Sequence, residues 1–182
     1  MNGNRAALAV VMAIVLFAAA WLFFKRSSSA PPVQLIPIFE TAEKRPADAT
    51  FEVIDADLNG ETRRAIATPA TSRITYKVRV PDNAWLRVAV GMKPESWTQE
   101  GNGVLFFAGV SDGRDFQELF RQHVNPFAIA GDRRWIQVWV DISAYAGEEV
   151  ELIFNTRPGP DDDPADERND LPLWGDPEIV VR

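Results

Sequence analysis

Polar and apolar residues alternate along the chain from about residue 50 onward, and this period of two is what most limits its fold. In SRITYKVRV at 72–80, every second residue from Ile74 to Val80 is apolar, and the residues between them are polar or charged. Successive side chains of a β-strand point to opposite faces, so this pattern predicts a half-buried strand. The alternation recurs at 85–90, 136–140 and 149–154, and the continuous apolar run at 103–110 is typical of a strand covered on both faces.

The segment DFQELFRQHV at 115–124 fits two patterns, because its apolar residues have helical spacing and also alternate. We favour a strand here because the neighbouring segments are strands. Residues 172–181 predict a last strand, entered through a turn at Gly175-Asp176-Pro177. About eight strands in some 130 residues predict an all-β fold, an antiparallel jelly-roll β-sandwich.

The stretch DISAYAGEE at 141–149 gathers Asp141, Ser143 and Tyr145 between two of these strands. A nucleophilic serine needs a base within reach, yet the chain has one histidine, His123, and no cysteine. Asp141 and Ser143 can accept hydrogen bonds from nearby backbone N–H groups, and Gly147 can adopt a positive φ. We therefore interpret the stretch as a turn and expect no enzyme activity and no cofactor.

The second half of the chain resembles the galactose-binding-like jelly rolls, the β-sandwich domains related to carbohydrate-binding modules. The resemblance rests on a strand ending in D-L-S-x-x-A-G, a strand of the V-x-L-x-F type and a late W-G-x-P-x-I. The matching residues are Asp141, Ile142, Ser143, Ala146 and Gly147; Val150, Leu152 and Phe154; and Trp174, Gly175, Pro177 and Ile179. In such domains the shared motif is largely scaffold and variable loops hold the ligand, so the resemblance implies a fold more than a function.

Residues 6–24 form a run of 19 uncharged, mostly apolar residues between Arg5 and the pair Lys25 and Arg26. As a helix this run would span roughly 28 Å, close to the hydrocarbon thickness of a bilayer. A cleaved signal peptide is the alternative, because Ala18-Ala19-Ala20 resembles a cleavage site. We favour an uncleaved transmembrane anchor, since the run continues through Phe24, with the following domain outside the cell membrane.

Residues 25–49 contain serines and prolines and are predicted to be a spacer between the anchor and the β-sandwich. The expected organisation is a tail at 1–5, the transmembrane helix at 6–24, the spacer at 25–49 and the β-sandwich at 50–182. The strip VQLIPIF at 33–39 is too apolar for a free linker, so we expect it to pack on its own domain or on a neighbouring protein. Its candidate contact residues are Val33, Leu35, Ile36 and Phe39.

Tryptophans provide the other candidate binding residues. Trp135 and Trp139 share a strand face with Gln137, and two exposed indoles at this spacing would form a flat platform for a sugar or a protein. If a second layer covers that face, both indoles belong to the core. Trp97 lies in the predicted loop KPESWTQEGNG and is another candidate for an exposed aromatic residue.

The loop RPGPDDDPADERND at 157–170 holds six acidic residues. Clustered carboxylates are the ligands that calcium prefers, which makes Asp161, Asp162, Asp163 and Asp166 a weak candidate site. No EF-hand spacing is present, and a solvated acidic loop or a docking surface for a basic partner fits as well. After residue 26 the chain has 16 basic and 26 acidic side chains, a balance that argues against nucleic acid as a partner.

These observations predict a non-catalytic, single-pass protein of a bacterial inner membrane with a periplasmic C-terminal domain. As its function we expect an accessory subunit that docks on the subunits of a larger membrane complex, for example a respiratory or photosynthetic one. The alternative is a membrane-anchored carbohydrate-binding module. The lipid bilayer is the expected partner of the N-terminal helix, and a glycan is the partner under the alternative.

Overall fold

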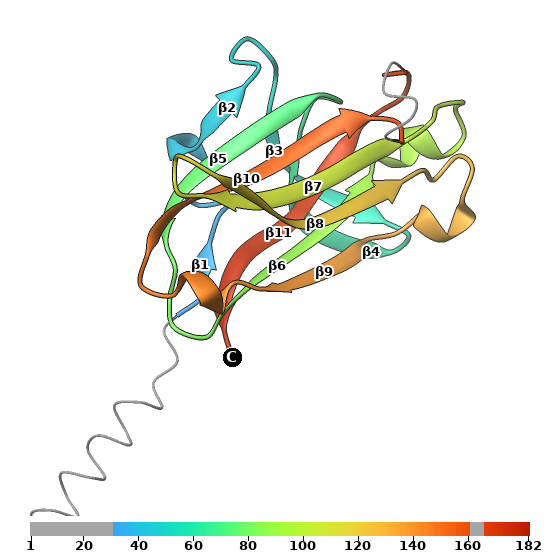
Figure 1. Cartoon of the computed structure of the whole chain (residues 1–182). Helices are drawn as coiled ribbons and strands as arrows, with labels where there is room; N and C mark the ends of the chain where they lie inside the picture. The colour runs from blue at the N-terminus through green and yellow to red at the C-terminus, as the bar shows by residue number, and fades with distance from the viewer. Residues whose placement is uncertain (1–30, 161–165) are drawn as a thin grey trace, which may run out of the picture. The chain divides into compact units, whose positions relative to one another are not determined.

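The computed structural model describes residues 31–160 and 166–182, and the strands in it form two antiparallel sheets packed face to face (Figure 1). Sheet A has the order β3 (Glu52–Leu58), β4 (Glu61–Ala67), β11 (Pro172–Val181), β6 (Ala84–Met92) and β9 (Ile136–Asp141). Sheet B has the order β2 (Glu43–Arg45), β5 (Ser72–Arg79), β10 (Glu149–Pro158), β7 (Val104–Ser111) and β8 (Phe116–Val124). The predicted all-β, antiparallel fold is confirmed.

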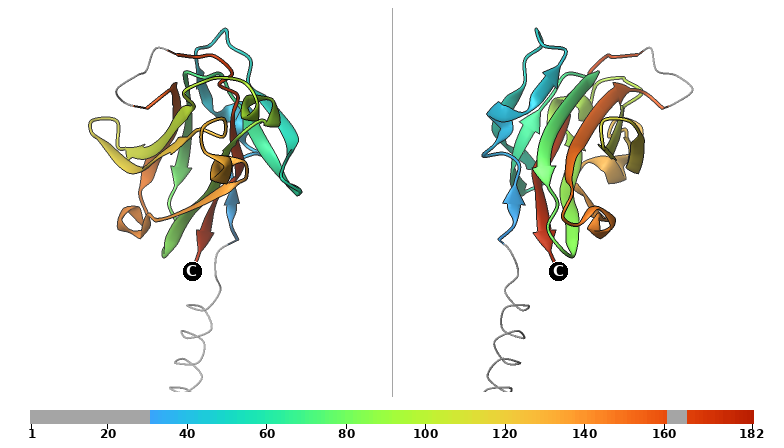
Figure 2. Two further views of the ribbon diagram at one scale, coloured as in Figure 1. Left: turned by 90° about the vertical axis from the view of Figure 1, so that its right-hand side faces the viewer. Right: turned by 60° about the vertical axis from the view of Figure 1, so that its left-hand side comes forward.

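One further short strand, β1 (Val33–Gln34), pairs with the second half of β11, opposite Ile179 and Glu178. The two views in Figure 2 show β1 in blue alongside β11 in red. Leu35 and Phe39 are buried in the core, and β2 pairs with β5. The sandwich unit therefore begins at Pro32, which corrects the predicted start at residue 50, and the strip 33–39 packs on its own domain.

The hydrophobic core lies between the sheets and is built from the inward-facing residues of the alternating strands. The rings of Phe106, Phe120 and Phe154 all contact the indole of Trp174 edge-on, at centroid distances of 4.9–6.2 Å. Trp174 is 1% exposed, as expected for the large residue of the late W-G-x-P-x-I motif. Burying aromatic side chains of this size contributes much of the favourable free energy of folding.

Four short 3₁₀ helices connect strands within the described residues: η1 (Phe39–Thr41), η2 (Pro94–Trp97), η3 (Ala130–Asp132) and η4 (Ser143–Tyr145). The predicted turn at DISAYAGEE contains η4. The Asp141 carboxylate accepts a hydrogen bond from the Ser143 backbone N–H at 2.9 Å, and Gly147 has φ of 82°. These contacts agree with the interpretation of the stretch as a turn.

The ambiguous segment 115–124 contains strand β8, as favoured. The predicted turn at Gly175-Asp176-Pro177 is instead a β-bulge within β11, where the register against β6 shifts between Gly175 and Glu178. The bulge allows one continuous strand to pair with β4 before the shift and with β1 after it.

The predicted transmembrane helix at 6–24 lies outside the described residues. Within the described ranges, no helix has the length and apolar character needed to cross a membrane.

Candidate functional site

A groove of about 740 Å³ lies on the outer face of sheet A, the face directed away from the core. Its floor follows from strand register. Gln34, Glu178, Arg87 and Trp139 stand opposite one another on the neighbouring strands β1, β11, β6 and β9. Residues on the same face of paired strands are neighbours, so four segments distant in sequence place an amide, a carboxylate, a guanidinium and an indole in one row.

The remaining walls come from β4, from the bulge of β11 and from the turn after β1. The groove residues outside the row are Ile36, Pro37, Glu61, Thr62, Arg63, Arg64, Gln137, Asp176 and Pro177. The lining therefore combines charged and amide side chains with apolar surface, which suits a ligand that carries both hydroxyl groups and C–H faces.

Ion pairs hold the charged side chains of the groove in place. Arg87 pairs with Glu178, whose side chain is 8% exposed. Arg63 pairs with Glu61 at 2.5 Å and with Asp176 at 3.6 Å, and Arg64 pairs with the exposed Asp55 at 3.2 Å. The amide of Gln137 donates from Nε2 to the Val88 carbonyl oxygen at 2.9 Å, which orients its side chain. These contacts preorganise the charged side chains of the groove and the amide of Gln137.

The two tryptophans of the predicted platform are separated by the structure. Trp139 is 38% exposed and lines the groove. Trp135 is 4% exposed, and its indole lies over Gly175 and Gly91 in a second apolar cluster on the outer face of sheet A. Its Nε1–H donates to the Glu61 carbonyl oxygen at 2.9 Å. The two-indole platform is therefore corrected to a single indole beside a buried one.

Among the other sequence candidates, Ile36 lines the groove, and Val33 and Ile36 are half-buried against the core. Leu35 and Phe39 are buried and unavailable to a partner. Trp97 is half-buried, and its Nε1–H donates to the Met92 carbonyl oxygen at 3.1 Å.

The acidic loop is described only in part, because Asp161, Asp162 and Asp163 lie outside the described residues. Asp166 accepts two hydrogen bonds from the Arg168 guanidinium at 2.8 Å, and this pairing lowers the pKa of Asp166 to about 2. In the described part of the chain, no three acidic or histidine side chains are grouped as metal ligands. Calcium binding by this loop stays a prediction.

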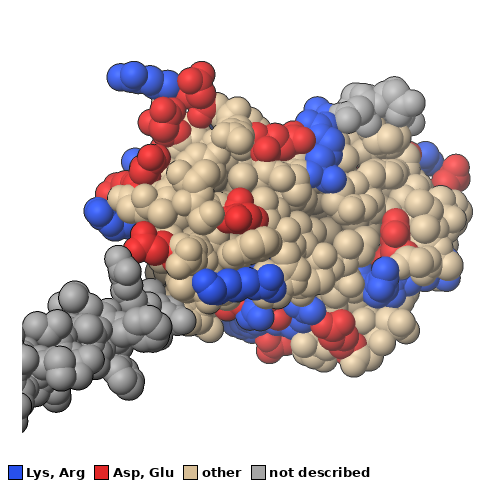
Figure 3. Space-filling model, turned by 60° about the horizontal axis from the view of Figure 1, so that its bottom comes forward, with Lys and Arg blue, Asp and Glu red and all other residues tan. Residues whose placement is uncertain are grey.

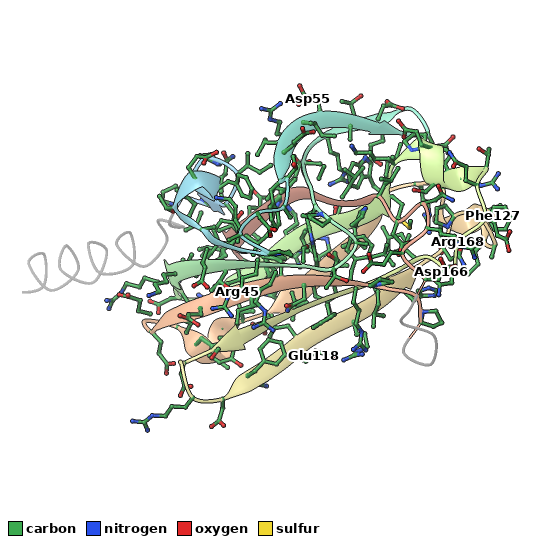
Figure 4. The ribbon with its side chains drawn as sticks, turned by 90° about the horizontal axis from the view of Figure 1, so that it is seen from above. Arg45, Asp55, Glu118, Phe127, Asp166 and Arg168 are labelled. Atoms are coloured by element: carbon green, nitrogen blue, oxygen red, sulfur yellow. The ribbon has the colours of Figure 1, made fainter. Side chains whose placement is uncertain are left out.

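Sequence reasoning did not single out the exposed residues Phe127 and Ile129, which are 43% and 49% exposed. Figure 4 shows Phe127 at the same end of the sandwich as Asp166 and Arg168. Phe127 and Arg168 line a shallow depression there, together with Gln99 and Asn169, but this depression has no room for a water molecule. We call this region the loop end. It is the second candidate for a binding site.

Sequence reasoning also did not select Gln34, Arg63, Arg87, Asp176 and Glu178 as site residues. Each lies at an outward position of a strand or bulge, which alone gives no functional signal. Figure 3 shows charged side chains of both signs dispersed over the face seen there, so no single-sign patch marks a site on that face.

The sequence has a relative among known proteins, although no protein-family model matches it. An uncharacterised protein of Archaeoglobus fulgidus (strain ATCC 49558) is 34% identical over 134 residues, which is 72% of this chain and 31% of that protein. The chain thus spans less than a third of this relative's length.

Solved structures of carbohydrate-binding modules share the fold. CBM51 from Clostridium perfringens GH95, in complex with methyl-galactose, has a TM-score of 0.56 at 17% identity, over 82% of this chain and all of that one. The CBM22-2 xylan-binding domain of Paenibacillus barcinonensis Xyn10C has a TM-score of 0.51 at 10% identity, over 84% and 99% of the two chains.

At these identities the similarity concerns the fold alone, and it confirms the predicted carbohydrate-binding-module-like β-sandwich. Neither the structure nor the comparisons support docking on a membrane complex, which stays a prediction.

Proposed function

We propose that this β-sandwich is a carbohydrate-binding domain that holds its glycan in the groove on sheet A. The observation that carries the proposal is the cross-strand row in which the exposed indole of Trp139 stands beside the Arg87–Glu178 pair. An indole face can pack against the C–H face of a pyranose ring, while amide, guanidinium and carboxylate groups bond to its hydroxyls.

The fold similarity supports this choice over an accessory role in a membrane complex. Several of the similar solved structures are carbohydrate-binding modules, and two are described with methyl-galactose and with β-1,4-galactotriose as ligands. The proposed role is non-catalytic, and the polar groups of Asp141 and Tyr145 both make hydrogen bonds within the fold. Tyr145 donates from its hydroxyl to Gln117 Oε1 at 2.6 Å, and Asp141 accepts from the Ser143 N–H.

We also propose that residues 6–24 anchor the protein in the cell membrane and that the sandwich lies outside the cytoplasm. The length and apolar character of that segment support anchoring. Protease treatment of intact cells tests the orientation: an extracytoplasmic sandwich is accessible once any outer barrier is permeabilised, whereas a cytoplasmic one stays protected until the cell membrane is lysed.

A glycan array tests the binding proposal. The full chain, purified in detergent, is applied to an array of neutral, acidic and amino-sugar glycans. We expect binding to a restricted set of glycans that is lost with Trp139→Ala. The matched control is Phe116→Ala, because Phe116 is 46% exposed but lies on β8 of sheet B. A chain that binds no glycan, or a Trp139→Ala variant that binds like the wild type, contradicts the proposal.

A further inference from the structure

The guanidinium of Arg182 lies over two indole rings, those of Trp139 and Trp85. Its guanidinium carbon is 4.1 Å from the ring centroid of Trp139 and 4.9 Å from that of Trp85. The Arg182 backbone N–H donates to the Asn83 carbonyl oxygen at 3.1 Å, which ties the end of β11 to the start of β6. A guanidinium packs on aromatic faces through its planar, weakly hydrated surface, so Arg182 links the indoles of Trp85 and Trp139.

Arg182 and Trp139 are close neighbours, but they differ in their relation to the groove. Trp139 lines the groove, but neither Arg182 nor Trp85 does so. Arg87, directly opposite on β6, adds a second guanidinium 5.4 Å from the Trp139 centroid, and Arg87 is itself paired with Glu178. The indole is thus supported by two cations.

We propose that Arg182 is a positioning residue that holds the Trp139 indole as a fixed wall of the groove without itself lining the groove. This inference rests on the proposed function. A freely rotating tryptophan would lose side-chain entropy when a sugar stacks on it, whereas an indole already held by Arg182 loses less. Arg182 therefore raises affinity without touching the glycan.

The test combines glycan affinity with a direct view of the indole. The full chain is labelled with 5-fluorotryptophan, and the ¹⁹F resonance of Trp139 is assigned by its loss in Trp139→Phe. Arg182→Gln removes the stacked cation, Arg182→Lys keeps the charge but loses the planar group, and Arg79→Gln changes an exposed arginine of sheet B. Each variant is also titrated with the best glycan from the array.

We expect Arg182→Gln to shift the Trp139 resonance toward that of free fluorotryptophan and to weaken binding about two- to five-fold, the range for an exposed cation–π contact. Arg182→Lys should fall in between and Arg79→Gln should match the wild type. An Arg182→Gln variant with wild-type affinity overturns the positioning role, even if the resonance moves. If the wild type binds no glycan, the proposed function fails, and an unshifted resonance in Arg182→Gln then overturns the stacking separately.

Discussion

Trp139 on β9 lies directly opposite Arg87 on β6, and the Arg87 guanidinium also pairs with the buried carboxylate of Glu178 on β11. Three neighbouring strands of sheet A are thus linked through side chains on their outer face. A carboxylate this deeply buried depends on its partner, because removal of one member of a buried pair leaves an uncompensated charge.

Replacing Arg87 should therefore destabilise the fold. We expect Arg87→Met to lower the free energy of unfolding by about 2 kcal/mol, less than for a fully buried pair because the Arg87 side chain is 41% exposed. Urea denaturation measures the change. Arg79→Met is the control and should stay within about 0.5 kcal/mol of the wild type. If Arg87→Met were as stable as this control, the result would contradict the structural role of the pair Arg87 and Glu178.

Gly175 should not tolerate a side chain, because a Cβ there would lie 2.8 Å from the Trp135 ring. We expect Gly175→Ala to displace that indole and to lower the free energy of unfolding by about 1–3 kcal/mol, the usual cost of overpacking. The tryptophan emission of the protein should shift to longer wavelength as the Trp135 ring becomes exposed to water. At Gly131 the nearest atom to an added Cβ is 4.0 Å away, so Gly131→Ala is the matched control. Equal stability of the two variants would mean that Trp135 does not lie against Gly175.

Asp170 should make stability depend on pH. Asp170 is 6% exposed and, within the described residues, its carboxylate oxygens have no hydrogen-bond partner. Burial, with added repulsion from Asp166 and Glu167, raises the pKa of Asp170 from 3.8 to about 7. Between these two values the folded state binds more protons than the unfolded state, so this group's contribution to stability is full at low pH and is lost as pH rises through about 7.

Unfolding free energies at pH 5 and pH 8 test this effect. We expect the free energy of unfolding to fall less between pH 5 and pH 8 in Asp170→Asn than in the wild type, since an amide does not ionise. Asp115→Asn, at an exposed turn position, should leave the decline unchanged. If wild type and Asp170→Asn decline equally, Asp170 does not carry a raised pKa in the folded protein.

Much of the fold could be predicted from the sequence, because polar and apolar residues alternate wherever only one face of a strand meets the core. The strands at 72–79, 136–141 and 149–158 show it clearly. The hairpin of β3 and β4 was harder to recognise, since Ala56, Leu58 and Ala65 on its outward side are buried in the second cluster. Its turn residues Asn59 and Gly60 both have positive φ, and this Asn-Gly pair was the signal available for the hairpin.

The site was less predictable, because it depends on register between distant strands. Trp135, Gln137 and Trp139 alternate on one strand face, and nothing local distinguishes the buried indole from the exposed one. Trp135 is buried because Gly91 and Gly175, from β6 and β11, leave room for its ring. The other residues of the groove come largely from four other strands, β1, β4, β6 and β11, and their proximity to Trp139 follows only from the folded sheet.

The central claim is that a glycan binds in the groove on sheet A and not at the loop end. Isothermal titration calorimetry of the full chain with its best array glycan tests this claim, with Trp139→Ala compared against Phe127→Ala. Both residues are about 40% exposed aromatics, at 38% and 43%, and each occupies one of the two candidate sites. We predict that Trp139→Ala lowers affinity at least tenfold, a loss of about 1.4 kcal/mol, while Phe127→Ala binds like the wild type. Loss of binding in Phe127→Ala with wild-type affinity in Trp139→Ala would contradict the account and place the glycan at the loop end.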